Sequence, residues 1–235
     1  MRSPGGGGGR WPAAFGWAAF AAWIGAAAFG LLGSPPERGM GHLQKIMYVH
    51  LPVVWMAFLA YFAVFIASGL HLWRGGERSD LFAASAAEVG TVLTGLTLAI
   101  GSIWARPTWG IWWTWDPRLT TTAILFLIFV GYLTLRSFVD DAERRGRWSA
   151  VVGILGFLNV PVVYMSVRWW RTIHQTQSSP ETVDAVFVAA LRVNAIAFLF
   201  VAGYLVYRRY RTAVVEREAE RVEEAAALGE GRVHA

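Results

Sequence analysis

Six apolar stretches, each about the length of a membrane-crossing helix, constrain this chain more than any other feature of its sequence. A helix needs roughly 20 apolar residues to cross the hydrocarbon core of a bilayer. Hydrophobic residues make up 55% of the 235 residues and charged residues only 16%, whereas soluble domains carry about 25% charged residues. Lipid offers the backbone no hydrogen-bond partners, so such segments form helices. The sequence therefore predicts an all-α integral membrane protein with six transmembrane helices, at residues 11–32, 46–72, 81–103, 119–138, 148–167 and 186–207.

The two ends of the chain flank this predicted membrane domain, which occupies residues 11–207. Residues 1–10 are rich in glycine and are predicted to be disordered. Residues 208–235 mix Glu and Arg with Ala, which predicts a charged cytoplasmic tail. We expect a solvated helix with charge pairs three and four residues apart, a partner-binding segment being the alternative. The first apolar stretch exceeds the 7–15 residues of a signal-peptide core and is expected to remain as a helix.

The distribution of Lys and Arg predicts which side of the membrane each loop faces. With the N-terminus inside, fourteen of these residues lie in inner segments and seven in outer ones, and six of the fourteen belong to the tail. Positive residues accumulate on the cytoplasmic side, so both termini are expected there, with the loops at 33–45, 104–118 and 168–184 outside. The net charge of +5 follows from these flanking residues and gives no reason to expect a nucleic-acid partner. The absence of Cys excludes disulfides and thiolate ligands.

The second outer loop, 104–118, holds an unusual concentration of tryptophan. Membrane proteins often carry Trp as an interfacial belt, which explains Trp11, Trp73 and Trp148 well. Four Trp within the seven positions 109–115 exceed what anchoring requires. Indole rings also stack on flat π systems. We therefore expect a platform for a broad, planar, apolar ligand, formed by Trp104, Trp109, Trp112, Trp113 and Trp115.

Two histidines flank this loop in the sequence. His50 and His174 are both expected near the outer membrane surface, and His42 lies in the first outer loop. A single histidine in such a place is usually an interfacial residue bonded to a backbone carbonyl. Neutral imidazole is also the usual protein ligand of haem iron, and a haem offers two axial positions. A flat aromatic platform with two histidines on the same side therefore predicts a haem site.

Asp116 and Pro117 are typical of an N-cap and the first position of a helix. We expect Asp116 to cap the fourth helix and, with Gly110, to position the tryptophan loop; direct contact with the ligand is the alternative. Haem propionates need cations at the water-facing edge. Four outer cations are candidates, ordinary snorkelling at the membrane surface being the alternative for each: Lys45, Arg106, Arg118 and Arg171.

One acid, Glu88, lies well inside the third predicted helix, about two turns from its inner end. Intramembrane acids are functional candidates by default. At this depth Glu88 is expected to reach water or to pair with a neighbour, and it has no expected role in the outer site.

Three segments resemble a family of haem-handling membrane proteins. The sequence WARPTWGIWWTWDPRLT at 104–120 is similar to their tryptophan-rich WWD signature. IMYVHLP at 46–52 and WWRTIHQ at 169–175 resemble the first-histidine and second-histidine motifs of the CcmC family. The resemblance covers about residues 11–207, and the chain length and the six predicted helices fit it as well.

The resemblance implies that His50 and His174 are axial ligands of haem b, bound as cargo, and that the WWD loop holds the haem edge. It implies delivery of haem from the outer face of the bacterial inner membrane to a periplasmic, CcmE-like haem chaperone. Partners implied in the same way are an ABC-type ATPase, its membrane subunit and a small single-helix subunit. The alternative is a haem lyase acting directly on apocytochrome c; lyases of this family are larger, so the length favours a haem-transfer protein that is not an enzyme.

Two absent motifs limit what this sequence is expected to do by itself. It contains no P-loop, so ATP hydrolysis by that route is not expected. It contains no Cys-x-x-Cys-His motif, so it is not expected to be a c-type cytochrome.

Overall fold

The structure, a computed structural model, is all-helical in the residues it describes, 10–175 and 183–233. The glycine-rich segment predicted to be disordered lies outside them except for its last residue. Six helices are long and apolar enough to cross a membrane, which confirms the predicted fold class. The elements are α1 (Arg10–Gly33), the short 3₁₀ helix η1 (His42–Ile46), α2 (Met47–Arg74), α3 (Glu77–Trp109), α4 (Pro117–Phe138), α5 (Ala142–Phe157), α6 (Asn159–Trp169) and α7 (Ala185–Val233).

Helix α3 is longer than the sequence predicts. It was expected to end at residue 103, but it continues to Trp109 and ends where Gly110 adopts a φ of 79°. That left-handed conformation favours glycine, and the Gly110 N–H closes the last turn on the carbonyl of Arg106 at 3.0 Å. The predicted loop at 104–118 is therefore a loop only at residues 110–116, and Trp104 and Trp109 are helical residues.

The fifth predicted helix is two helices, α5 and α6, which break at Leu158. Pro161 has no N–H to donate to the carbonyl of Phe157, four residues earlier. The N–H of Leu158 bonds instead to the carbonyl of Leu155 at 3.2 Å, a tighter turn than an α-helix has. The two pieces together are long enough for one membrane span, Ala142–Trp169.

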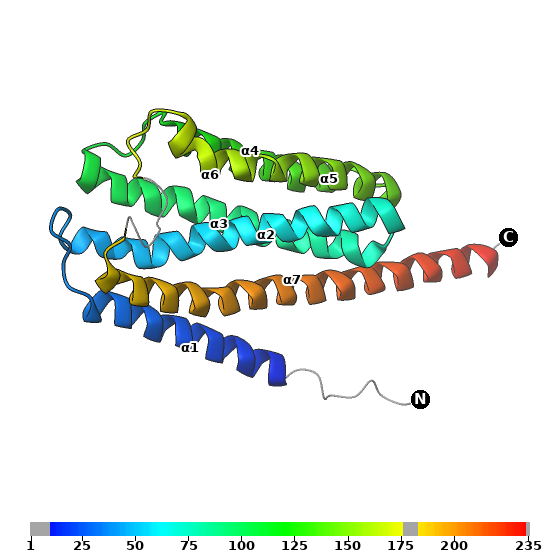
Figure 1. Ribbon diagram of the computed structural model, residues 1–235. Helices are drawn as coiled ribbons and strands as arrows, with labels where there is room; N and C mark the ends of the chain where they lie inside the picture. The colour runs from blue at the N-terminus through cyan, green and yellow to red at the C-terminus, as the bar shows by residue number, and fades with distance from the viewer. Residues whose placement is uncertain (1–9, 176–182, 234–235) are drawn as a thin grey trace.

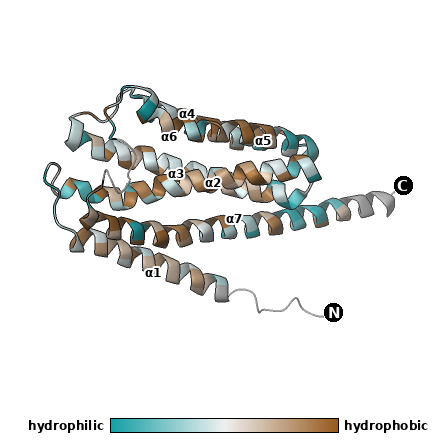
Figure 2. Ribbon diagram, viewed as in Figure 1, coloured by the Kyte–Doolittle hydropathy of each residue, from teal (hydrophilic) through white to brown (hydrophobic). Residues whose placement is uncertain are grey.

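The helices form three layers (Figure 1). Helices α2 and α3 lie in the middle, α4, α5 and α6 cover one side, and α7 with α1 covers the other. Apolar residues predominate along the middle of the helices and polar residues near both ends (Figure 2). We call the end where α2 and α4 begin the site end and the opposite one the far end.

Packing in the centre depends on a close approach of α2 and α3. The Tyr61 ring stacks on Phe129 of α4 with centroids 3.7 Å apart, and its hydroxyl lies 2.8 Å from Thr94 Oγ1. A Cβ on Gly90 of α3 would come within 2.8 Å of the Tyr61 ring. Glycine at this position therefore lets the two helices touch around a buried aromatic ring.

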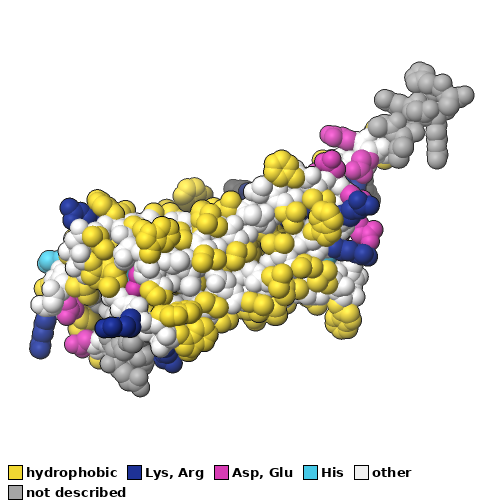
Figure 3. All heavy atoms as spheres, turned by 90° about the horizontal axis from the view of Figure 1, so that it is seen from above, with side chains coloured by type: hydrophobic (Ala, Val, Ile, Leu, Met, Phe, Trp, Pro, Cys, Tyr) yellow, Lys and Arg dark blue, Asp and Glu magenta, His cyan; other side chains and the backbone are white. Residues whose placement is uncertain are grey.

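The far end is held by ion pairs. Arg136 of α4 makes two hydrogen bonds, of 2.6 and 2.8 Å, to the carboxylate of Asp80 on α3. Glu88, whose pairing the sequence left open, forms an ion pair with Arg209 of α7. Charged side chains gather at the two ends of the molecule and hydrophobic ones cover the flank between them (Figure 3).

The charged tail continues α7 without interruption and extends beyond the bundle (Figure 1). The pair Arg217–Glu220 has the predicted spacing of three residues. Arg217 and Arg221 also form ion pairs with Glu77 at the start of α3. The first part of the tail is therefore joined to the bundle rather than wholly solvated.

Candidate functional site

A cavity of about 590 Å³ opens at the site end, between α2, α3, α4 and α6. Pockets that bury small molecules usually measure about 300–1,000 Å³. Apolar side chains form most of this cavity's wall. The residues of its wall on which the argument depends are His50, Trp104, Trp109, Trp113, Arg118 and His174.

His50 lies in the first turn of α2, on the cavity wall. The edge of its ring faces Trp104, with ring centroids 5.8 Å apart and planes at 75°. On α3, a Cβ at Gly101 would come within 3.3 Å of the His50 ring, so glycine leaves space for the imidazole. Among the described residues, the buried Nδ1 of His50 has no hydrogen-bond partner.

His174 reaches the same cavity from the loop after α6. Its ring packs edge-on against Trp109 at 4.9 Å, and its Nδ1 lies 3.4 Å from Asp116 Oδ1. The geometry at Nδ1 is not that of a hydrogen bond, so this contact is electrostatic. Burial lowers the pKa of the His174 imidazole to about 4, although the Asp116 carboxylate acts in the opposite direction. His174 is therefore neutral near pH 7, the form that binds metals.

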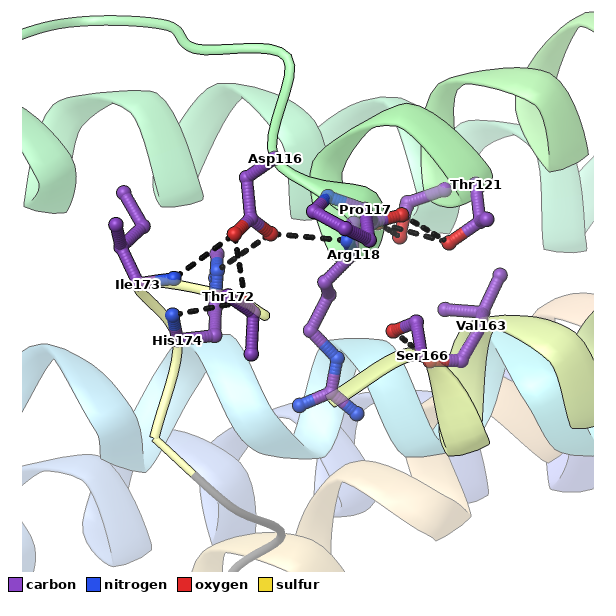
Figure 4. A network of polar contacts seen from close by, with 10 residues as sticks. Asp116, Pro117, Arg118, Thr121, Val163, Ser166, Thr172, Ile173 and His174 are labelled. Atoms are coloured by element: carbon purple, nitrogen blue, oxygen red, sulfur yellow. Dashed lines mark hydrogen bonds and ion pairs between the residues drawn. The ribbon is translucent and has the colours of Figure 1, made fainter. Parts of the chain in front are cut away.

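Asp116 connects the tryptophan loop, α4 and the His174 loop (Figure 4). Its Oδ1 accepts from the Arg118 N–H at 2.9 Å, which confirms the predicted N-cap. Its Oδ2 accepts from the Thr172 hydroxyl at 2.6 Å and from the Ile173 N–H at 2.9 Å. Burial alone would raise the pKa of Asp116, but these hydrogen bonds outweigh it and lower the pKa. The ionised carboxylate therefore holds the second-histidine segment against the start of α4.

The structure divides the five candidate tryptophans into two groups. Trp104, Trp109 and Trp113 line the cavity. Trp112 and Trp115 do not, and 58% and 78% of their surfaces are exposed. The loop turns after Gly110, so consecutive side chains point to different sides. Of the five, three therefore belong to the wall, two of them on α3 and one on the loop, and Trp55 of α2 adds a fourth indole ring.

The four candidate cations also have different positions. Arg118 lines the cavity, and its side chain is directed away from the Asp116 carboxylate (Figure 4). Lys45 is buried and donates to the Leu31 carbonyl at 2.6 Å, and Arg106 donates to the Gly110 carbonyl at 2.6 Å. Arg171 is exposed on the loop. Of the four, only Arg118 belongs to the cavity wall.

Sequence reasoning missed Thr172 and Gly101. The Thr172 hydroxyl both donates to Asp116 and accepts from the His174 N–H at 3.0 Å, which fixes the loop before the imidazole. Its position two residues before a candidate histidine was the one available signal. For Gly101, which lies within α3, nothing in the sequence indicated that it faces His50.

Six apolar helices with a cavity at one end, walled by two histidines and four tryptophans, indicate a multi-pass membrane protein with an aromatic-lined pocket. The family model described as "Heme exporter protein C" (CcmC) matches residues 8–225. The chain therefore belongs to the CcmC family, whose members handle haem for cytochrome c maturation.

Curated relatives agree with the family match. The chain is 39% identical to Heme exporter protein C of Bradyrhizobium diazoefficiens over 183 residues, which cover 75% of this chain and 69% of that protein. It is 30% identical to Heme exporter protein C of Escherichia coli K12 over 189 residues, covering 80% and 77% of the two chains. The corresponding protein of Paracoccus denitrificans is 31% identical, with 78% of each chain covered.

Proposed function

We propose that this protein binds haem in the cavity at the site end, with His50 and His174 as the two axial ligands of the iron. The observation that carries the proposal is that these histidines, one on α2 and one in the loop after α6, line the same cavity. Four tryptophans line it with them, and their rings offer flat apolar surface to a macrocycle.

His50 and His174 suit a metal ion whose equatorial ligands belong to its own cofactor and not to the protein. In the described part of the chain, no group of three His, Asp or Glu side chains gathers that could hold a bare metal ion. Two neutral imidazoles can fill the two axial positions of a haem iron. The Arg118 guanidinium lines the cavity, where it offers hydrogen-bond donors to a propionate. Haem b is accordingly the proposed cargo.

The proposal includes an orientation and a destination. The excess of Lys and Arg at the far end and in the tail supports cytoplasmic termini, with the site end at the periplasmic face of the bacterial inner membrane. There the protein hands its haem to a CcmE-like periplasmic chaperone and works beside an ABC-type ATPase, its membrane subunit and a small single-helix subunit. We propose a transfer protein rather than an enzyme. Co-purification with apocytochrome c instead of the chaperone would favour the haem lyase.

Haem quantitation in single histidine variants tests this function. His50→Ala and His174→Ala should each lower the haem retained per protein at least tenfold, because each removes a ligand from the iron. His71→Ala is the matched control: His71 lies at the far end, with its Nδ1 3.0 Å from the Gly76 carbonyl. Haem loss from the His71 variant equal to that from the other two would contradict the proposed site, as would full retention in both site variants.

A further inference from the structure

The cavity has three closed sides and one loose side. Helices α2 and α3, α3 and α4, and α4 and α6 pack directly on one another. Helix α6 is held on α4, where Asn159 Nδ2 donates to the Thr121 carbonyl at 2.9 Å. Helices α2 and α6, in contrast, have hardly any contact, although residues of both line the cavity. The seam between these two helices is therefore the side on which the wall lacks helix packing.

One face of α2 is covered by α5 toward the far end and is uncovered toward the site end. Val54, Phe58, Phe62 and Phe65 recur at helical spacing and so lie along one face. Phe62 and Phe65 contact Phe157 at the end of α5, with ring centroids 5.7 and 4.9 Å apart. Val54 and Phe58, nearer the site end, line the cavity instead. These aromatic contacts close the seam from the far end as far as Phe157. Between Phe157 and the site end the seam is not closed in this way.

The break between α5 and α6 explains why the seam lacks helix packing between Phe157 and the site end. The chain leaves α2 at Leu158 and continues as α6 against α4. Leu158, at the break, and Tyr164, on α6, are 56% and 46% exposed. Among the described residues, no further helix lies over the seam. At this seam the cavity wall is therefore formed by side chains of α2 and α6 without direct packing of the two helices.

We propose that the seam between α2 and α6, on the site-end side of Phe157, is a lateral portal through which lipid-dissolved haem enters the cavity. This inference rests on the proposed haem-binding function. An apolar planar ring with an acidic edge dissolves in the outer part of a bilayer with its acids at the surface. Entry through the seam keeps the ring in apolar surroundings throughout, and it brings the acidic edge toward Arg118 in the first turn of α4.

Cross-linking the seam tests the portal, and the absence of native Cys makes introduced thiols unique. The seam variant is Val54→Cys with Tyr164→Cys, closed by bifunctional thiol reagents of graded length. The control is Phe62→Cys with Phe157→Cys, which cross-links α2 to α5 where they already touch. Each full-length protein is reconstituted in lipid, and haem is supplied in separate vesicles. The growth of the Soret band gives the loading rate before and after cross-linking.

The closed seam should slow haem loading from vesicles at least tenfold and leave the Soret band of protein loaded beforehand unchanged. The cross-linked control should load within twofold of its reduced form. Equal loading rates for the seam variant in both forms would overturn the portal and assign entry to the loops of the site end. A second pair, Phe58→Cys with Tyr164→Cys, excludes a local effect of Val54. Failure of both wild-type protein and the reduced Phe62→Cys, Phe157→Cys control to bind haem at equilibrium would count against the cavity itself, and so against the proposed function.

Discussion

Asp116 shows how one residue serves two purposes at this site. Its role as an N-cap follows from the local sequence, and capping alone predicts that Asn or Ser would replace it. The second carboxylate oxygen, however, accepts from Thr172 and Ile173 of a distant segment. Because a side-chain amide cannot accept on both atoms, the structure changes the expected effect of this substitution.

Asp116→Asn should keep α4 intact but weaken haem binding about tenfold or more. Hydrogen bonds to charged groups contribute about 1.5–3 kcal/mol, and the Asn amide would face the Ile173 N–H with a donor. Thr172→Val is the companion variant, since it removes one bond to Asp116 and the acceptor of the His174 N–H but leaves the cap. Haem titration followed by the Soret band measures both. Wild-type affinity in Asp116→Asn would show that the cap is the whole of its role.

A second prediction at the scale of single residues concerns the tryptophans. Trp113→Ala should speed haem dissociation, because it removes a flat ring from the cavity wall, and Trp113→Phe should have a smaller effect. Aromatic pairs contribute about 0.5–1.5 kcal/mol beyond the burial of their area. Trp112→Ala is the control, because that ring lies outside the wall. Equal dissociation rates for the Trp112 and Trp113 variants would contradict this division of the loop.

At the scale of helices, two of the candidate cations satisfy helix ends. The last carbonyls of a helix lack partners within it. Lys45 donates to Leu31 in the last turn of α1, and Arg106 donates to Gly110 just after α3. These contacts join η1 to α1 and hold the start of the tryptophan loop. Cationic residues that the sequence does not distinguish therefore have different structural roles.

Lys45→Met should lower stability by roughly 1–3 kcal/mol, because it leaves the Leu31 carbonyl without its charged partner. Haem affinity in the folded protein should stay within twofold of wild type. Arg118→Gln should show the reverse, with near-normal stability and weaker haem binding. Thermal unfolding in detergent micelles and haem titration separate the two. A Lys45→Met variant with wild-type stability but without haem binding would instead assign Lys45 to propionate binding.

At the scale of the whole molecule, the cavity and the ion pairs between helices lie at opposite ends. The histidines and tryptophans of the cavity lie at the site end. The buried Asp80–Arg136 pair and the contacts of the tail with α3 lie at the far end. The two ends are joined by packed apolar helices, so changes at the far end are expected to alter stability without altering the haem spectrum.

Asp80→Asn should destabilise the protein by about 3–5 kcal/mol, because it leaves the Arg136 guanidinium buried without a counter-charge. Replacing both partners with apolar residues, Asp80→Leu with Arg136→Met, should recover most of that loss. Denaturant unfolding in micelles gives the stability, and the Soret maximum of the folded fraction reports on the site. A shifted Soret maximum with unchanged stability would mean that the two ends are coupled.

Much of the site was also predictable, but only as a set of residue types. His50, His174 and the tryptophans were expected to act together because hydropathy places them on one side of the membrane. Sidedness does not say which rings face inward, so Trp112 and Trp115 were grouped with Trp113. The Arg118 guanidinium was not distinguishable from Lys45 or Arg106, since all three flank apolar segments.

The sequence by itself determined the six apolar helical segments and the capping role of Asp116, because segment length, hydropathy and capping preference act over a few residues. Only the tertiary structure decided that α3 reaches Trp109, that α6 leaves α2 at Leu158 and that Asp116 holds the His174 loop. The physical reason is that these features depend on contacts between segments far apart in the chain. The cavity exists because α2, α3, α4 and α6 meet there, and no local pattern encodes how tightly each pair of them packs.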